Sequence, residues 1–206
     1  PEVKVGLLPG GGGTQRMPRL IGIAQSLPYL LEGSNISAQE AKKVGLVHEV
    51  VPPSELIAAA KRWLLGSPVV VQPWDQKGFK VPGGAGFANP AVATTFTGAT
   101  ALVARKTLHN LPAPVTILSC VYEGTLVPID QALEIEAKYF ATLVTNPVSR
   151  NLIRTMFVNK GNADKLTVRP EGVPRSQVKK LGVLGAGMMG AGVAYVSAMA
   201  GMDVVL

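Results

Sequence analysis

The stretch PEVKVGLLPGGGGTQRMPRLIG, residues 1–22, sets four glycines in a row between an apolar run and a basic segment. A phosphate-binding P-loop needs Gly-Lys followed by Ser or Thr, whereas Thr-Gln-Arg follows these glycines. We therefore interpret the glycines as a tight backbone turn. It follows an expected short strand, Val3 to Leu8.

The composition of the chain limits the binding partners and the cellular compartment that we expect. The chain has 206 residues, only 16% of them charged, and a net charge of +7. Its basic residues are scattered and no aromatic residues interleave with them, which favours mild attraction for phosphorylated small molecules over nucleic acid. A single cysteine, Cys120, excludes an internal disulfide and suits a reducing compartment. Both ends lie inside apolar, structured stretches, so we expect an internal piece of a longer polypeptide.

The chain divides into three expected regions. Residues 1–66 combine a short strand, the glycine turn and helices, and a second strand is expected over 46–51. Residues 67–177 hold a Pro-rich segment and a mostly helical linker. A stripe of Leu133, Phe140 and Val144 predicts that the linker helices dock on the first region.

The third region, 178–206, reads as strand, tight turn, small-residue helix and strand. Gly185, Gly187 and Gly190 fit G-x-G-x-x-G at the start of that helix, with Met188 and Met189 between them. In a dinucleotide-binding (Rossmann) β-α-β unit, such glycines permit the turn, the approach of a pyrophosphate, and close helix–strand packing. The overall expectation is therefore an α/β fold that ends in a cofactor-binding unit.

One alternative accompanies this interpretation, and the choice of cofactor stays open within it. Residues 181–202 carry no charge and could span a bilayer, although glycines in a membrane helix would weaken it where the dinucleotide fold needs a turn. Asp203 precedes the last strand, so we do not assign it to the cofactor ribose. The residues present leave the choice between NAD and NADP open.

The opening stretch resembles the enoyl-CoA hydratase (crotonase) family, whose signature is P-E-x-x-x-G-x-x-P-G-x-G-G-T-Q-R. The matching positions are Glu2, Gly6, Pro9, Gly10, Gly12, Gly13, Thr14, Gln15 and Arg16. Residues 36–52, ISAQEAKKVGLVHEVVP, are similar to a later part of the same family. The resemblance implies that residues 1–66 are the C-terminal part of a crotonase fold. It also implies that Glu2 is one of two catalytic glutamates, acting as general acid/base at C2 of the thioester.

The order of crotonase tail, Pro-rich segment, helical linker and G-x-G-x-x-G unit resembles the α subunits of bacterial fatty-acid β-oxidation complexes. That family implies enoyl-CoA hydratase and NAD-dependent 3-hydroxyacyl-CoA dehydrogenase activities, an acyl-CoA substrate, a thiolase β subunit as candidate partner, and a cytoplasmic location. Gly185, Gly187, Met188, Met189 and Gly190 would bind the cofactor. A 3,2-enoyl-CoA isomerase and a non-catalytic helical connector remain the alternatives.

The other polar residues carry no expected chemistry. His48 and His109 match no catalytic position and are interpreted as surface or capping residues, and Glu123 as structural. No His, Cys, Asp or Glu cluster has metal-ligand spacing. Because the resemblance places the other catalytic glutamate and the oxyanion hole upstream, we expect the 206-residue chain alone to be inactive.

Overall fold

The computed structural model describes residues 2–66, 70–174 and 176–206. The chain divides into two compact units, the first ending at Gly161 and the second beginning at Asn162. The main helices of the first unit are α1 (Gly13–Ile21), α2 (Ile23–Glu32), α3 (Ala38–Lys43), α4 (Leu56–Gly66), α5 (Pro90–Thr107), α6 (Pro112–Thr125), α7 (Ile129–Val144) and α8 (Pro147–Ile153). Short 3₁₀ turns are η1 (Glu2–Val5), η2 (Pro53–Glu55) and η3 (Pro73–Asp75). A π-helical segment, η4 (Arg154–Asn159), leads into α9 (Lys160–Asp164).

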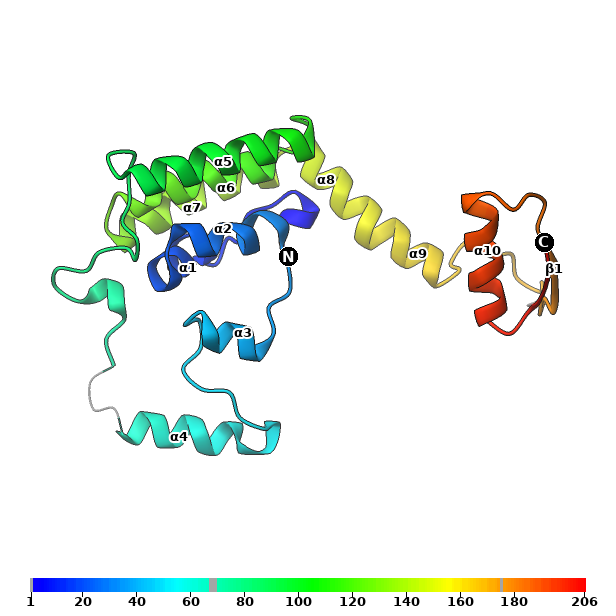
Figure 1. Ribbon diagram of the computed structural model, residues 1–206, viewed down its shortest axis with the longest axis horizontal. Helices are drawn as coiled ribbons and strands as arrows, with labels where there is room; N and C mark the ends of the chain where they lie inside the picture. Colours follow the sequence, from blue (N-terminus) through cyan, green and yellow to red (C-terminus); the bar gives the residue numbers. More distant parts are fainter. Residues whose placement is uncertain (1, 67–69, 175) are drawn as a thin grey trace. The chain divides into compact units, whose positions relative to one another are not determined.

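The core of the first unit is helical. Helices α1 and α2 pack against α5, α6 and α7, as Figure 1 shows, so the predicted docking of these later helices on the first region is present. The buried side chains at these contacts include Leu8, Leu27, Phe96, Ile117, Val121 and Leu143. Burying such apolar side chains is the main stabilising term for helices of this length.

Local signals fix several helix ends. The Ser37 hydroxyl accepts a hydrogen bond from the Glu40 amide at 3.1 Å, which caps α3 as its sequence predicts. Asn146 caps α8 in the same way, through the Val148 amide at 2.8 Å, and Pro147 follows at the first helical position. Asn146-Pro147 therefore separates α7 from α8, since proline disfavours helix at the residue before it.

The prediction of two strands in the first region is wrong. Glu2–Val5 forms the 3₁₀ turn η1, and residues 46–51 lie in irregular structure. A strand is stable only when a neighbouring strand pairs with it, and the described part of this unit offers none. The residues of both segments have β propensity, but strand formation also depends on pairing with residues far away in the sequence.

The face of α7 that packs inward also differs from the predicted stripe. Ala132, Glu136 and Leu143 are buried, whereas Val144 is 50% exposed. Phe140 is only partly buried, although it packs against the core. The inward face of α7 therefore lies at a different angle around the helix from the predicted stripe. It includes a polar residue, Glu136, which a prediction based only on apolar residues leaves out.

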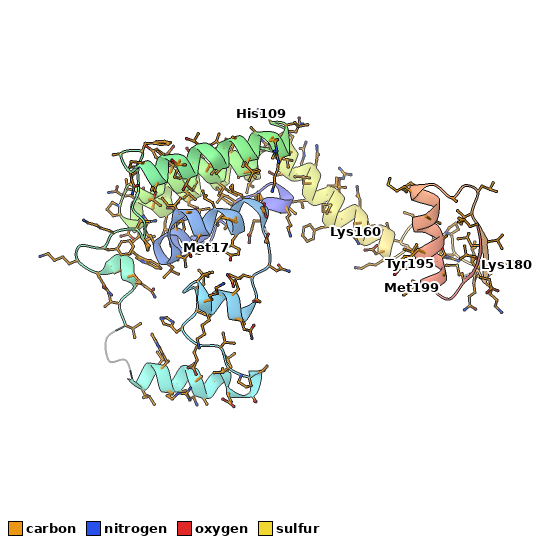
Figure 2. The ribbon with its side chains drawn as sticks, viewed as in Figure 1. Met17, His109, Lys160, Lys180, Tyr195 and Met199 are labelled. Atoms are coloured by element: carbon orange, nitrogen blue, oxygen red, sulfur yellow. The ribbon has the colours of Figure 1, made fainter. Side chains whose placement is uncertain are left out.

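The second unit contains strand β1 (Lys180–Gly182), helix α10 (Met188–Met199) and strand β2 (Asp203–Val205). The two strands pair in parallel, with Lys180 opposite Asp203. Figure 2 shows Tyr195 and Met199 on the side of α10 that points away from Lys180. Within the described ranges, no helix has both the length and the apolar character needed to cross a membrane, and α10 covers only part of the uncharged stretch.

Candidate functional site

The four glycines form the turn that opens α1. Gly12 stands at the N-cap with φ 89°, in the left-handed region that disfavours other residues. A Cβ on Gly10 would lie 2.7 Å from the ring of Phe140 on α7, whereas a Cβ on Gly11 would meet nothing within 4 Å. The glycines therefore serve a tight reversal and a close approach of α7.

This turn binds a carboxylate from within the same unit. Glu136 of α7 is only 2% exposed, and its Oε1 accepts a hydrogen bond from the Gly12 amide at 2.5 Å. Its Oε2 accepts from the Thr14 amide at 3.0 Å and also from the Thr14 hydroxyl. The first amides of a helix lack intrahelical partners and, with the helix dipole, favour an anion. The anion here is an internal side chain.

Glu136 is not among the residues that the sequence singles out. The sequence could have indicated Glu136 through its position on the helix. Ala132, Glu136 and Leu143 share one face of α7, and this face is buried. A carboxylate on a buried helical face needs hydrogen-bond donors from a neighbouring element. A glycine-rich helix start elsewhere in the chain is one such source.

The signature residues after the glycines join α1 to α6. The Gln15 side chain, fully buried, donates from Nε2 to the backbone oxygen of Cys120 at 2.9 Å. Arg19 is 3% exposed and donates to the carbonyl oxygens of Gly124 at 2.8 Å and Val127 at 2.9 Å. Burial lowers the pKa of Arg19, yet a guanidinium stays charged at neutral pH. These polar residues therefore hold helices together.

Cys120 lies beneath the same turn. Its thiol is within hydrogen-bond distance of the Thr14 hydroxyl, at 3.3 Å. Burial raises the pKa of Cys120 to about 11, with a smaller contribution from the nearby carboxylates of Glu136 and Glu123. The group is therefore a neutral thiol near pH 7 and is unsuited to nucleophilic catalysis.

Glu2, the predicted catalytic acid, is the first residue of η1 and is half-buried. The amide of Gly6 donates to the Val3 carbonyl at 3.1 Å, and the amide of Leu7 donates to the Glu2 carbonyl at 3.0 Å. The Gly6 carbonyl in turn accepts a hydrogen bond of 2.6 Å from the hydroxyl of Ser149, a fully buried residue of α8. Glu2 thus begins a short, hydrogen-bonded turn that a linker helix holds.

An apolar groove of about 400 Å³ lies beside this turn. Val3 and Lys4 of η1 line it, together with apolar side chains of α2, α5 and α6. The ion pair between Lys106 and Glu32, 2.6 Å long, also lies along the groove. The groove offers an apolar surface with charged groups at its border.

The predicted cofactor-binding residues lie between β1 and α10. Gly185 has φ 99°, and Gly187 is the N-cap residue of α10. A Cβ on Gly190 would overlap the carbonyl oxygen of Gly185, so only glycine fits there. A Cβ on Gly185 or Gly187 would meet nothing within 4 Å.

The surroundings of this second turn are open. Leu184 is fully exposed, and Met188 and Met189 are 88% and 73% exposed. The turn therefore presents the start of α10 to solvent, with space at Gly185 and Gly187. A helix start of this kind can accept an anionic group from outside the chain.

His48, His109 and Glu123, which the sequence analysis interprets as structural or surface residues, have surroundings that fit such roles. The His48 ring lies 5.3 Å from the ring of Trp63, and His109 follows α5 with φ 60° (Figure 2). Glu123 accepts a hydrogen bond of 2.6 Å from Tyr139, which raises the pKa of Tyr139 to about 12. In the parts of the chain with described coordinates, no three His, Cys, Asp or Glu side chains are grouped to hold a metal ion.

Comparison with known proteins places the two halves of the chain in context. Residues 1–72 match the enoyl-CoA hydratase/isomerase family. Most of the chain is similar to fatty acid oxidation complex subunit alpha of Shewanella sp. strain MR-4, with 40% identity over 198 residues. The corresponding protein of Shewanella amazonensis is 41% identical over the same length. Each alignment covers 96% of this chain but 27% of the relative.

The match to the family coincides with the segment that carries Glu2, the glycine turn and helices α1 to α4. The longer similarity continues through the linker helices and the second unit. The chain therefore resembles, along nearly its whole length, a segment of the fatty acid oxidation complex alpha subunit, and its first 72 residues carry the match to the enoyl-CoA hydratase/isomerase family.

Proposed function

We propose that this chain works within a bifunctional fatty-acid β-oxidation enzyme, where it joins an enoyl-CoA hydratase to an NAD-dependent 3-hydroxyacyl-CoA dehydrogenase. One observation carries the proposal: a single similarity of 40% spans both the hydratase/isomerase match and the glycine turn between β1 and α10. In this account residues 1–66 complete a crotonase fold, 67–177 form the linker, and 178–206 begin a Rossmann domain.

The hydratase step adds water across the double bond of a 2-enoyl thioester. The hydroxyl group goes to C3 and the proton to C2, while the thioester carbonyl carries the developing negative charge. Glu2 is the group that exchanges the proton at C2. Its place in a hydrogen-bonded turn supports this role, since a catalytic acid must be held in one geometry.

The groove beside η1 supports an acyl substrate. Val3 and Lys4 directly follow Glu2 in the chain and line the groove, whose other walls are mainly apolar. An alkyl chain buried there would gain about 0.8 kcal/mol per methylene. The position of the groove beside η1, the turn that begins with Glu2, supports the proposal of an acyl-binding site.

The dehydrogenase half concerns the second turn. The backbone at Gly185, Gly187 and Gly190, with Met188 and Met189, would hold the pyrophosphate of NAD at the start of α10. A nicotinamide cofactor held there would supply the two-electron oxidation of the C3 hydroxyl group to a ketone. The open space at Gly185 and Gly187 supports this role, because a pyrophosphate must approach the backbone closely.

The test of the hydratase proposal is Glu2→Gln in the full-length protein. We expect hydration of crotonyl-CoA to fall by about 10²–10⁴-fold, the contribution of a general acid/base. NAD-dependent oxidation of 3-hydroxybutyryl-CoA serves as the internal control and should be unchanged. A full hydration rate in the variant would refute the assignment of Glu2.

Three further expectations belong to the same proposal. The 206-residue chain alone should not hydrate crotonyl-CoA, because the partner glutamate and oxyanion hole are assigned to preceding sequence. A thiolase β subunit is the proposed partner and the cytoplasm the proposed location. Co-purification of the tagged full-length protein with thiolase activity would test the partner.

The isomerase alternative shares the fold and can use the same Glu2. Activity of the full-length protein on 3-enoyl-CoA in place of 2-enoyl-CoA would favour it. The connector alternative predicts that the full-length protein acts on neither substrate.

A further inference from the structure

We propose that Glu136 and Ser149 position the segment that carries Glu2, so that the linker helices α7 and α8 are part of the hydratase site. This inference rests on the hydratase function proposed above. Both residues come from the proposed linker, and both bind backbone groups of the opening segment; Glu136 also binds the hydroxyl of Thr14. They are positioning residues, since neither is proposed to touch the substrate.

The first anchor lies four residues from Glu2. The Ser149 hydroxyl donates to the Gly6 carbonyl at 2.6 Å, and the amides of Gly6 and Leu7 bind the carbonyls of Val3 and Glu2. Gly6 has φ 76°, and a Cβ there would lie 3.0 Å from the Ser149 backbone. The hydroxyl therefore holds the peptide unit that closes the η1 turn.

The second anchor lies at the glycine turn. The hydrogen bonds found for Glu136 among the described residues all come from Gly12 and Thr14. Leu8, between the two anchors, is fully buried. The opening segment is thus fixed on both sides of a buried residue, and its backbone has little freedom to shift along α7 or α8.

The buried charge makes the second anchor specific. A carboxylate removed from water is costly unless hydrogen-bond donors surround it, so sliding of α7 would leave it unsatisfied. The turn likewise presents amides that need an acceptor. The pair therefore fixes one register of α7 against the segment, which apolar contacts alone would fix less strictly.

The experiment compares two variants of the full-length protein with matched controls. Ser149→Ala removes the first anchor, and Glu136→Gln places an amide group opposite at least one backbone donor. The controls are Asn151→Ala on α8 and Glu134→Gln on α7, both exposed residues. Hydration of crotonyl-CoA and NAD-dependent oxidation of 3-hydroxybutyryl-CoA are measured on every variant.

We expect kcat for hydration to fall about tenfold or more in each anchor variant, with KM within about twofold, because a small displacement of an acid affects the chemical step most. Dehydrogenase turnover and both control variants should stay within about twofold. If Glu136→Gln does not fold, Ser149→Ala alone decides.

Two results would overturn the inference. Full hydration rates in Ser149→Ala, with Glu2→Gln inactive, would leave the proposed function intact and remove the positioning role. Equal losses of hydratase and dehydrogenase activity would indicate general destabilisation instead. A fully active Glu2→Gln would refute the proposed function itself, which is a separate outcome.

Discussion

The chain contains two glycine-rich turns that each open a helix, and their surroundings differ. The turn before α1 is closed: Glu136 occupies its amides, and Phe140 packs against Gly10. The turn before α10 is open, with exposed side chains at Leu184, Met188 and Met189. A run of glycines therefore indicates a close approach to backbone, and only its surroundings tell whether the approaching group is internal or a ligand.

The largest expected effect concerns the closed turn. Glu136→Ala would leave the amides of Gly12 and Thr14 without their buried acceptor, so we expect a loss of about 3 kcal/mol in the free energy of unfolding. Urea unfolding of the chain measures it, and Glu134→Ala on the exposed face is the control. A loss no larger than that of the control would mean that the turn does not depend on Glu136.

The buried thiol of Cys120, next to the closed turn, should make the stability of the chain depend on pH. Its pKa is about 11 in the folded chain and about 9 in an unfolded one, so the unfolded state releases the proton first. The wild type should therefore lose about 2 kcal/mol of stability relative to Cys120→Ala as pH rises from 9 to 11. The measurement is urea unfolding of both proteins across that range. A constant difference would show that the thiol is not buried as described.

The open turn offers a matched pair of glycines on one helix. Gly190→Ala places a Cβ against the Gly185 carbonyl, whereas a Cβ on Gly192 meets nothing within 4 Å. We expect Gly190→Ala to weaken NADH binding to the full-length protein at least tenfold, about 1.4 kcal/mol, and Gly192→Ala to leave it unchanged. Fluorescence titration with NADH decides. Equal affinities would separate the second turn from cofactor binding.

The smallest effect uses neighbouring glycines of the closed turn. Gly12→Ala must adopt a positive φ beside Arg16, so we expect about 1 kcal/mol of destabilisation. Gly11→Ala enters open space and should change stability by less than about 0.5 kcal/mol. Thermal unfolding of both variants makes the comparison, and equal effects would contradict the described turn.

Sequence alone predicted what depends on neighbouring residues. Ser37 caps α3 through the Glu40 amide three residues away, so its signal is complete within a short window. The end of α7 before Asn146-Pro147 is likewise a local effect, because proline disfavours helix at the residue before it. The order of strand, turn, helix and strand after residue 178 is equally local and is present in the structure. The strand expected at Val3 to Leu8 is wrong because pairing needs a distant partner.

The hydrogen bonds of the closed turn and of the η1 turn could not be predicted from the sequence, because they join residues far apart in the chain. Glu136 lies 124 positions from Gly12, and Ser149 lies 143 positions from Gly6. No local pattern relates such residues, and Glu136 sits on a face that an apolar stripe passes over. Treating a polar residue within a buried helical face as a search signal would have found it.

Hydrogen–deuterium exchange of the full-length protein with and without NADH tests most directly the claim that one turn is filled from within and the other receives a cofactor. We predict slow exchange at residues 10–14 in both conditions, since the Gly12 and Thr14 amides bind Glu136, and new protection at residues 185–190 when NADH is present. Protection by NADH at residues 10–14, with none at 185–190, would contradict the account.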